Sequence, residues 1–368
     1  MQLATYLLTG KVIRDDIRDR HHPKQYPMIR SIFALLGAIT TTLTFAQTDS
    51  ADFFYKKGLQ EKQTGRRMES LKNFEKAATY NPNDKAIITE LGNVYYDLRR
   101  YGQAREVFKK LLTLGDNSAD NYRQLMNLSV NLKQNDDVIK YATKLKQVDP
   151  SAKVNAVIGK VYYDLDNYGD AIQYLTAALK EEPANAEVPY MIARSYGDML
   201  NYKQAVPFFE KAIALDTSKS NWVYELGLIC YAMHDDKNSL KYILQAGDRG
   251  YKKDNDYFEN LGIAYLNIGN LDEGVKILGE ILKKKPSDLN ILNMVAEAYY
   301  YKGKYSEAMN YWDTILGYDK TNASALYMIG MCYQKKGEKD KGVRLCDKAI
   351  EMDPSLASLK QKKMDMGL

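Results

Sequence analysis

The sequence predicts an all-α protein built from stacked pairs of helices, and three observations carry this prediction. Residue types recur with a period of 34 positions over most of the chain. Two fixed positions of the period are almost always small. Apolar residues within a period fall at helical spacing, as at Leu91, Val94, Tyr95 and Leu98. Because one helix pair cannot bury its apolar faces alone, the pairs are expected to stack into a continuous array.

Nine repeat units account for residues 51–356, and Asn-Pro or Asp-Pro closes several of them, as at Asn81-Pro82 and Asp353-Pro354. Proline stops the second helix of a unit because it has no backbone N–H to donate. The array as a whole spans 47–356, and residues 357–368 are expected to form a short C-terminal cap in which Leu359 covers the last unit. The predicted units are 51–84, 85–118, 119–151, 152–185, 186–219, 220–254, 255–288, 289–322 and 323–356.

The small residues stand at positions 8 and 20 of the unit, where they let the two helices of a pair cross closely. Each position is small in eight of the nine units. The third unit carries Met126 and Val138 instead, so its pair is expected to pack more loosely. Gly269, Gly303 and Gly337 stand at position 15, where the first helix must end and a positive φ is useful.

The pattern resembles the tetratricopeptide repeat (TPR) family, in which Leu-Gly, Tyr, Ala and Phe recur at fixed offsets within 34 residues. The second unit shows it as Leu91-Gly92, Tyr95, Ala104 and Phe108. The resemblance implies a right-handed α-solenoid of stacked antiparallel helix pairs, a TPR superhelix. It also implies that the first helix of each unit lines an inner groove, chiefly through positions 2, 5, 9, 12 and 13.

The N-terminal region is typical of a secretory signal. Arg30 precedes a stretch without charged residues from residue 31 to 48, and Ala46 ends a small-x-small sequence that a signal peptidase accepts. The prediction assigns 28–46 to a signal peptide with its start at Met28, and 1–27 to an unstructured upstream extension. An uncleaved anchor helix is the alternative, although the apolar run is short for a span of about 20 residues.

The mature chain lacks the motifs of common catalytic and cofactor sites. No GxxxxGK[ST], GxGxxG, CxxC or HExxH sequence occurs, and His234, in a predicted turn, is the only histidine after cleavage. Residues 47–368 carry 46 Lys and Arg against 44 Asp and Glu, whereas nucleic-acid binding needs a concentrated basic face. We therefore expect no enzyme, cofactor, metal or nucleic-acid partner, and no membrane span after cleavage. A Cys332–Cys346 disulfide and the oligomeric state stay open.

Tyrosine is enriched at positions that the resemblance places in the groove. Positions 5 and 12 give eighteen places in nine units, and eight are Tyr, whereas 30 tyrosines in 368 residues would supply about one or two by chance. Tyrosine offers a rigid contact face with a polar tip, although each ring has packing against the next unit as its alternative role. The predicted partner-binding residues, with polar neighbours included, are Tyr96, Tyr163, Tyr190, Tyr224, Tyr231, Tyr300, Tyr327, Asn93, Asn127, Arg123, Lys160 and Arg194.

Two hypotheses of function follow. The first is a non-enzymatic scaffold, exported to the periplasm or released outside the cell, that binds a protein or peptide in its Tyr-rich groove as part of an envelope-associated complex. The second is a glycan-binding or cell-wall-binding adaptor that uses the same tyrosines as stacking platforms for sugar rings. Binding to a glycan array separates the two.

Overall fold

The computed structural model describes residues 49–358, so the predicted extension, the predicted signal peptide and residues 359–368 of the predicted cap lie outside the described residues. All regular structure between residues 49 and 358 is helical, and no strand occurs there. The predicted all-α class, a solenoid of stacked helix pairs, is therefore confirmed. Within the same range, no helix combines the length and apolar character needed to cross a bilayer.

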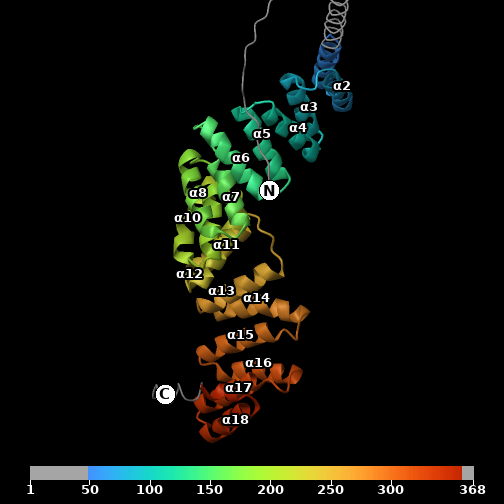
Figure 1. Cartoon of the computed structure of the whole chain (residues 1–368). Coiled ribbons are helices and arrows are strands. Elements are labelled where there is room, and N and C mark those ends of the chain that lie inside the picture. The colour runs from blue at the N-terminus through green and yellow to red at the C-terminus, as the bar shows by residue number, and fades with distance from the viewer. Residues whose placement is uncertain (1–48, 359–368) are drawn as a thin grey trace, which may run out of the picture. The chain divides into compact units, whose positions relative to one another are not determined.

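The chain divides into two compact units after Asn117, and each is described by itself. Each repeat supplies a first and a second helix joined by a short turn (Figure 1). The N-terminal unit contains a helix over residues 49–63, then α2 (Arg67–Tyr80), α3 (Lys85–Asp97) and α4 (Tyr101–Thr113). The C-terminal unit contains α5 (Ala119–Asn131), α6 (Asn135–Val148), α7 (Asn155–Asp164), α8 (Tyr168–Glu181), α9 (Glu187–Asp198), α10 (Tyr202–Leu215), α11 (Ser220–Ala232), α12 (Asp236–Asp248), α13 (Asn255–Asn267), α14 (Leu271–Lys284), α15 (Leu289–Tyr301), α16 (Tyr305–Tyr318), α17 (Ala323–Lys335), α18 (Lys339–Met352) and the 3₁₀ helix η1 (Pro354–Leu356).

The first helix of each repeat ends in a left-handed residue at position 15. Gly269, Gly303 and Gly337 have φ of +84°, +74° and +94°, as predicted. After Gly303, the Lys304 N–H donates to the Tyr299 carbonyl at 2.9 Å, which closes a Schellman turn. Five residues with side chains adopt the same conformation at the same position, with φ from +53° to +60°, and these are Arg99, Lys133, Asp166, Leu200 and His234.

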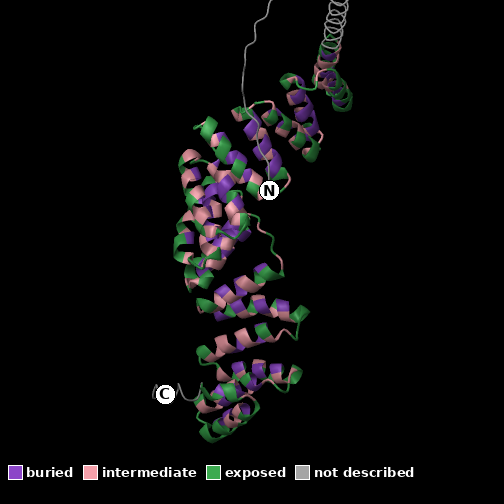
Figure 2. Cartoon of the chain, in the orientation of Figure 1, coloured by how far each residue is buried: buried purple, intermediate pink, exposed green. Residues whose placement is uncertain are grey.

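The small residues at position 8 pack against the large residue at position 24 of the same repeat. A Cβ atom placed on Gly92 would lie 2.8 Å from Phe108, and one on Gly227 would lie 2.9 Å from Ile243. The position-24 side chains are themselves in the core, since Phe108 is 1% exposed. Figure 2 shows buried residues on the helix sides that face neighbouring helices.

The prediction of a loose third pair is wrong, because position 24 compensates for position 8. Met126 and Val138 are 6% and 1% exposed, and Ala142 stands at position 24 with no exposed surface. The large residue has moved from the second helix to the first. A close-packed core tolerates such an exchange because the total volume is kept.

The turn after the second helix is fixed by an aspartate in several repeats. Asp216 Oδ1 accepts from the Ser218 backbone N–H at 3.0 Å and from its hydroxyl at 2.6 Å. Asp149 with Ser151 and Asp319 with Thr321 repeat the arrangement. These hydrogen bonds stabilise the ionised carboxylate, so the pKa of Asp149, of Asp216 and of Asp319 is lowered.

Candidate binding surface

All twelve predicted partner-binding residues lie on first helices, but their exposure differs. Lys160 and Tyr231 are exposed, whereas Tyr224 and Tyr327 are buried at 6% and 4% exposure. The remaining residues are half-buried, and these are Asn93, Tyr96, Arg123, Asn127, Tyr163, Tyr190, Arg194 and Tyr300.

The two buried tyrosines belong to the core of the array. The Tyr224 ring stacks on Tyr251 with centroids 4.2 Å apart, and its hydroxyl accepts from Asn260 Nδ2 at 2.7 Å. Tyr327 joins a core cluster with Cys346 and Leu356 at the end of the array. Both side chains present little surface to a partner, and burial is the reason.

Tyr163 and Tyr190 donate their hydroxyls to carboxylates of the following repeat. Tyr163 Oη donates to Asp198 Oδ2 at 2.9 Å, and Tyr190 Oη donates to Glu225 Oε1 at 3.0 Å. Arg194 Nη1 donates to the same Tyr190 hydroxyl at 3.2 Å and lies 3.6 Å from Glu225. These residues therefore join consecutive repeats on the first-helix side.

Burial controls the protonation of this cluster. Desolvation raises the pKa of Tyr190 to about 12. Desolvation also raises the pKa of the Glu225 carboxyl, although the hydrogen bond from Tyr190 and the charge of Arg194 oppose the rise. The cluster is internally satisfied, so its polar groups are already engaged without a ligand.

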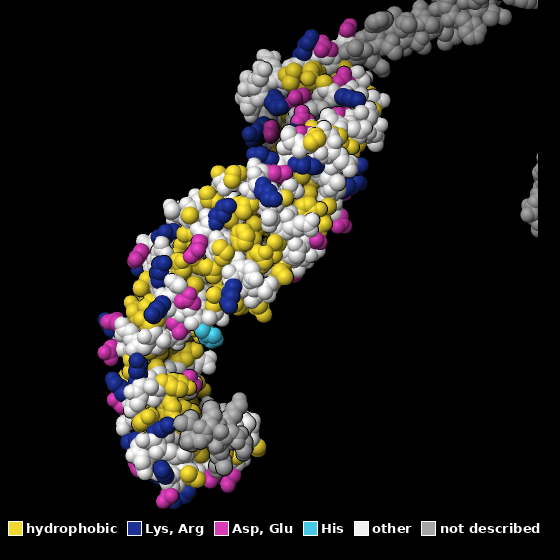
Figure 3. Space-filling view, turned by 90° about the vertical axis from the view of Figure 1, so that its left-hand side faces the viewer, with side chains coloured by type: hydrophobic (Ala, Val, Ile, Leu, Met, Phe, Trp, Pro, Cys, Tyr) yellow, Lys and Arg dark blue, Asp and Glu magenta, His cyan; other side chains and the backbone are white. Residues whose placement is uncertain are grey.

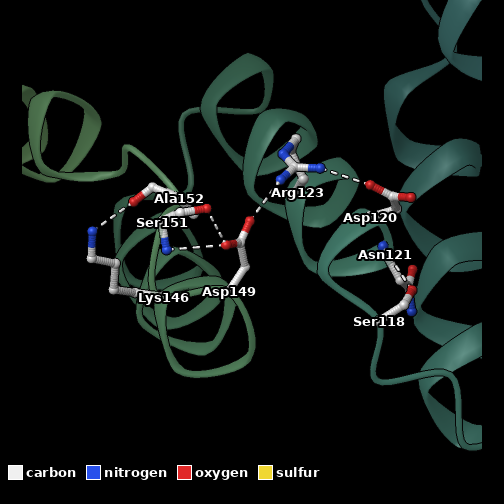
Figure 4. Close-up of polar contacts among 8 residues, drawn as sticks. All are labelled: Ser118, Asp120, Asn121, Arg123, Lys146, Asp149, Ser151 and Ala152. Atoms are coloured by element: carbon white, nitrogen blue, oxygen red, sulfur yellow. Dashed lines mark hydrogen bonds and ion pairs between the residues drawn. The ribbon is translucent and has the colours of Figure 1, made fainter. Parts of the chain in front are cut away.

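Arg123 is likewise paired within the chain (Figure 4). Its guanidinium lies 2.7 Å from Asp120 Oδ1 and 3.4 Å from Asp149 Oδ2. Asp149 in turn accepts from Ser151 in the turn that ends this repeat. Arg123 therefore connects α5 to the turn that follows α6.

The other predicted residues contact their own repeat. Tyr96 lies edge-on to Tyr101 with centroids 5.6 Å apart, and Tyr300 lies edge-on to Trp312 at 6.0 Å. Lys160 pairs with Asp164 at 3.0 Å one helical turn away. Asn93 and Asn127 lie half-buried on α3 and α5.

A hollow of about 620 Å³ opens on the first helices of the sixth to eighth repeats, and of the predicted residues only Tyr231 lines it. This volume is in the range of ligand and peptide-side-chain pockets. Figure 3 shows that hydrophobic side chains, tyrosine included, gather in patches between charged ones on the face that it presents. The lining residues are Tyr231, Ile263, Leu266, Asn267, Ile268, Gly269, Met294, Glu297, Ala298, Tyr301 and Lys302.

The rim of the hollow carries unusually exposed apolar and aromatic side chains. Tyr301 is 80% exposed, Tyr231 is 42% exposed and Ile268 is 39% exposed. Tyr301 stands at position 13, outside the two positions at which tyrosine is enriched. The residues at position 9 could have indicated from the sequence where the apolar surface lies. They are polar from Asn93 to Arg194 and mostly apolar after it, with Leu228, Ile263 and Met331.

The described residues contain no group of three or more His, Cys, Asp or Glu side chains placed to hold a metal ion. Cys230, Cys332 and Cys346 are all buried and free, so the Cys332–Cys346 disulfide left open above is absent. Burial raises the pKa of Cys230 to about 11 and that of Cys332 to about 12. His234 lies exposed in the turn after α11.

Family models described as tetratricopeptide repeat match several segments of the chain. One model matches residues 152–185, 186–219 and 323–356, the bounds of three predicted units. A second model of the same description matches residues 55–119.

A curated relative and several solved structures are similar to parts of this chain. Anaphase-promoting complex subunit 3 of Schizosaccharomyces pombe is 25% identical over 126 residues, which cover 34% of this chain and 19% of that protein. The chain thus spans about a fifth of that relative's length.

Two solved structures of TPR proteins are similar to large parts of this chain. A TPR repeat-containing protein of Cytophaga hutchinsonii, known for its C-terminal part, has 18% identity and a TM-score of 0.46, covering 77% of this chain and 99% of that chain. YrrB, described as a TPR protein with an unusual peptide-binding site, has 22% identity and a TM-score of 0.40, covering 51% of this chain and 97% of that chain.

The helix pairs of about 34 residues, the small residues at the crossing points and the matched family models agree. The chain contains tetratricopeptide repeats.

Proposed function

We propose that this chain is an exported, non-enzymatic TPR scaffold that binds a protein or peptide partner on its first helices, within an envelope-associated complex. The observation that carries the proposal is the hollow on α11, α13 and α15, with Tyr231, Ile268 and Tyr301 exposed around it. Contiguous exposed apolar surface on a folded protein marks an interaction site. Tyrosine adds a rigid contact face at low entropic cost.

The predicted Tyr-rich groove contributes through its exposed members. Tyr231 lines the hollow, and Tyr163 and Tyr190 keep part of their rings at the surface while their hydroxyls are engaged. Tyr224 and Tyr327 contribute little surface, since both side chains are buried in the core of the array. The binding surface of the proposal is therefore narrower than the full set of groove tyrosines.

The test compares two variants of the full chain in capture from an envelope fraction. The Tyr231→Ala/Tyr301→Ala variant should keep the helical circular dichroism signal and lose the captured partner, because both rings are exposed. Tyr318→Ala is the matched control, since Tyr318 is 53% exposed on the second helix α16. Capture that survives in the double variant contradicts the proposal.

Export rests on the sequence of residues 28–46 alone. N-terminal sequencing of the protein from whole cells tests it. A mature chain that begins at Gln47 supports export, whereas a chain that retains residues 28–46 favours the anchor alternative.

The glycan-binding alternative uses the same exposed tyrosines, and hydrogen-bonding side chains stand beside them. Asn267, Glu297 and Lys302 line the hollow together with the aliphatic side chains of Ile263, Leu266, Ile268, Met294 and Ala298. Binding of the chain to a glycan array, lost in the Tyr231→Ala/Tyr301→Ala variant, would support the adaptor role in place of the peptide role.

A further inference from the structure

The hollow on the sixth to eighth repeats combines an apolar wall with two charged side chains. The aliphatic part comes from two successive first helices, with Ile263 and Leu266 on α13 and Met294 and Ala298 on α15. A wall of aliphatic side chains binds apolar groups by removing both surfaces from water. The size and openness of the hollow suit one or two side chains of a peptide.

Lys302, at the C-terminal end of α15, lines the hollow without an opposite charge. No ion pair or hydrogen bond of its ammonium is found within residues 49–358, whereas Lys160 on α7 and Lys276 on α14 each pair with a carboxylate one turn away. Its Nζ lies 2.8 Å from the place that a Cβ atom on Gly269 would take. Glycine at position 269 therefore leaves room for the ammonium beside the last turn of α13.

Glu297, between Met294 and Ala298 along α15, adds the opposite charge to the lining. Its Oε1 accepts from the Asn293 amide at 2.9 Å, and no cationic side chain of the described residues pairs with it. Glu297 and Lys302 are five residues apart around the end of α15, which is about 7.5 Å along a helix axis. An extended peptide covers that distance in two to three residues.

We propose that the hollow binds an extended segment of a partner protein that places an apolar side chain against Ile263, Leu266 and Met294, an acidic residue at Lys302 and a basic residue at Glu297. This inference rests on the proposed function and names the chemistry of its ligand. The acidic and the basic residue lie two to three residues apart along the segment. Tyr231 and Tyr301 cover the apolar side chain from the rim.

Charge complementarity selects this occupant over others. A purely apolar segment leaves Lys302 and Glu297 desolvated without partners, which costs free energy. A segment with the two charges exchanged brings like charges together at Lys302 and at Glu297. The positions of the acidic and basic residues therefore fix the direction in which the segment lies along α15.

Selection from a random-peptide phage library on the full chain is the experiment. Enriched sequences are expected to share an apolar residue together with an acidic and a basic residue that stand two to three positions apart. A synthetic peptide of the enriched sequence, labelled with fluorescein, should bind the wild-type chain and lose at least tenfold in affinity to the Tyr301→Ala variant and to the Lys302→Glu variant. Lys211→Glu, on the exposed part of α10, is the matched control and should bind as wild type does.

The charge-swapped chain Glu297→Lys/Lys302→Glu gives a sharper test. This variant should bind a peptide in which the acidic and the basic residue are exchanged, and it should no longer bind the original peptide. Circular dichroism shows that each variant keeps its helices.

Three results would overturn the inference. The enriched peptides could lack the acidic and basic residues, the Lys302→Glu variant could bind the peptide as tightly as the wild type, or the Glu297→Lys/Lys302→Glu variant could fail to exchange its preference. So would a library that yields no hollow-dependent peptide. The proposed function fails separately, when the Tyr231→Ala/Tyr301→Ala variant still captures its partner. A surviving function with a failed charge test leaves a scaffold whose hollow binds another kind of segment, and the inference is then wrong.

Discussion

The crossing of α17 and α18 depends on two glycines, and replacing one of them gives a stringent test of the packing argument. Gly330 stands at position 8 and Gly342 at position 20 of the last repeat. A Cβ atom on Gly342 would lie 2.5 Å from the Gly330 carbonyl oxygen and 2.8 Å from the Gln334 backbone nitrogen. Both contacts are to backbone atoms, so no side-chain rotation relieves them.

The expected cost of Gly342→Ala is about 1–3 kcal/mol, the range measured for overpacked cores. The cost should fall in the lower part of this range, because other repeats accommodate a larger residue at the same position. Other repeats hold alanine at position 20, for example Ala171 opposite Gly159, so α17 and α18 have a wider spacing to which they can relax. Alanine gains in helix propensity over glycine and offsets part of the cost.

Gly279→Ala is the matched control, because Gly279 lies inside α14 and a Cβ atom there meets nothing within 4 Å. This substitution should stabilise the chain by about 0.5–1 kcal/mol through lower entropy of the unfolded chain. Urea denaturation followed by circular dichroism measures both variants. Repeat arrays need not unfold in one step, so hydrogen exchange of α18 amides reports the local effect.

The reasoning is refuted when Gly342→Ala is as stable as the wild type and the α18 amides keep their protection. A loss of stability in Gly279→Ala equal to that in Gly342→Ala would also refute it. In that case the cost would belong to alanine in general and not to the helix crossing.

Three further predictions follow from the structure. Gly303→Ala should lower the free energy of unfolding by about 1 kcal/mol, because φ is +74° and the added Cβ meets no other atom that could offset the strain. Leu200→Gly should raise the free energy of unfolding by up to about 1 kcal/mol, because Leu200 has φ of +60° and is 71% exposed. Urea midpoints measure both changes, and a shift of both midpoints in the same direction would contradict the argument. The thiols of Cys230 and Cys332 have pKa values raised to about 11 and about 12, so they should react only slowly with Ellman's reagent at pH 8 in the native chain. They should react at once after unfolding in guanidinium. Fast labelling of the native chain would place both thiols at the surface. The lowered pKa of Asp216 stabilises the folded chain at any pH above the unfolded-state pKa of about 4, and this stabilisation is lost as the pH falls through the folded-state pKa. The urea midpoint of Asp216→Asn should therefore decline less steeply in acid than that of the wild type. An equally steep decline would count against the Asp–Ser turn.

The helix pairs were predictable because their signals repeat within each unit. Position 8 faces position 24 in all six repeats that have glycine at position 8, as at Gly92 with Phe108, so the residue type there carries the same meaning in each. The third repeat was mispredicted because the small residues were sought at positions 8 and 20 alone. Ala142 on the other helix restores the volume, and this pairing of positions is visible only in the packed structure.

The exposure of the tyrosines was not predictable from their position in the repeat. Tyr190 and Tyr224 both stand at position 5, yet Tyr190 is half-buried and Tyr224 is 6% exposed. Tyr190 stacks on Trp222 of the following unit, with ring centroids 4.4 Å apart. Tyr224 stacks on Tyr251 of its own 35-residue unit at 4.2 Å and also lies beside Tyr257 of the following unit at 6.1 Å. The same repeat position thus meets different neighbours in different units.

The amino-acid order by itself determined the repeat length, the helix pairs, their crossing points and the glycine turns, since each of these depends on residues close together in one unit. The tertiary structure decided which side chains stay exposed and where the hollow opens, with Tyr301 and Lys302 at its edge. The physical reason is that exposure and cavities depend on how three consecutive repeats fill the space between them, and residues of one unit do not carry that information.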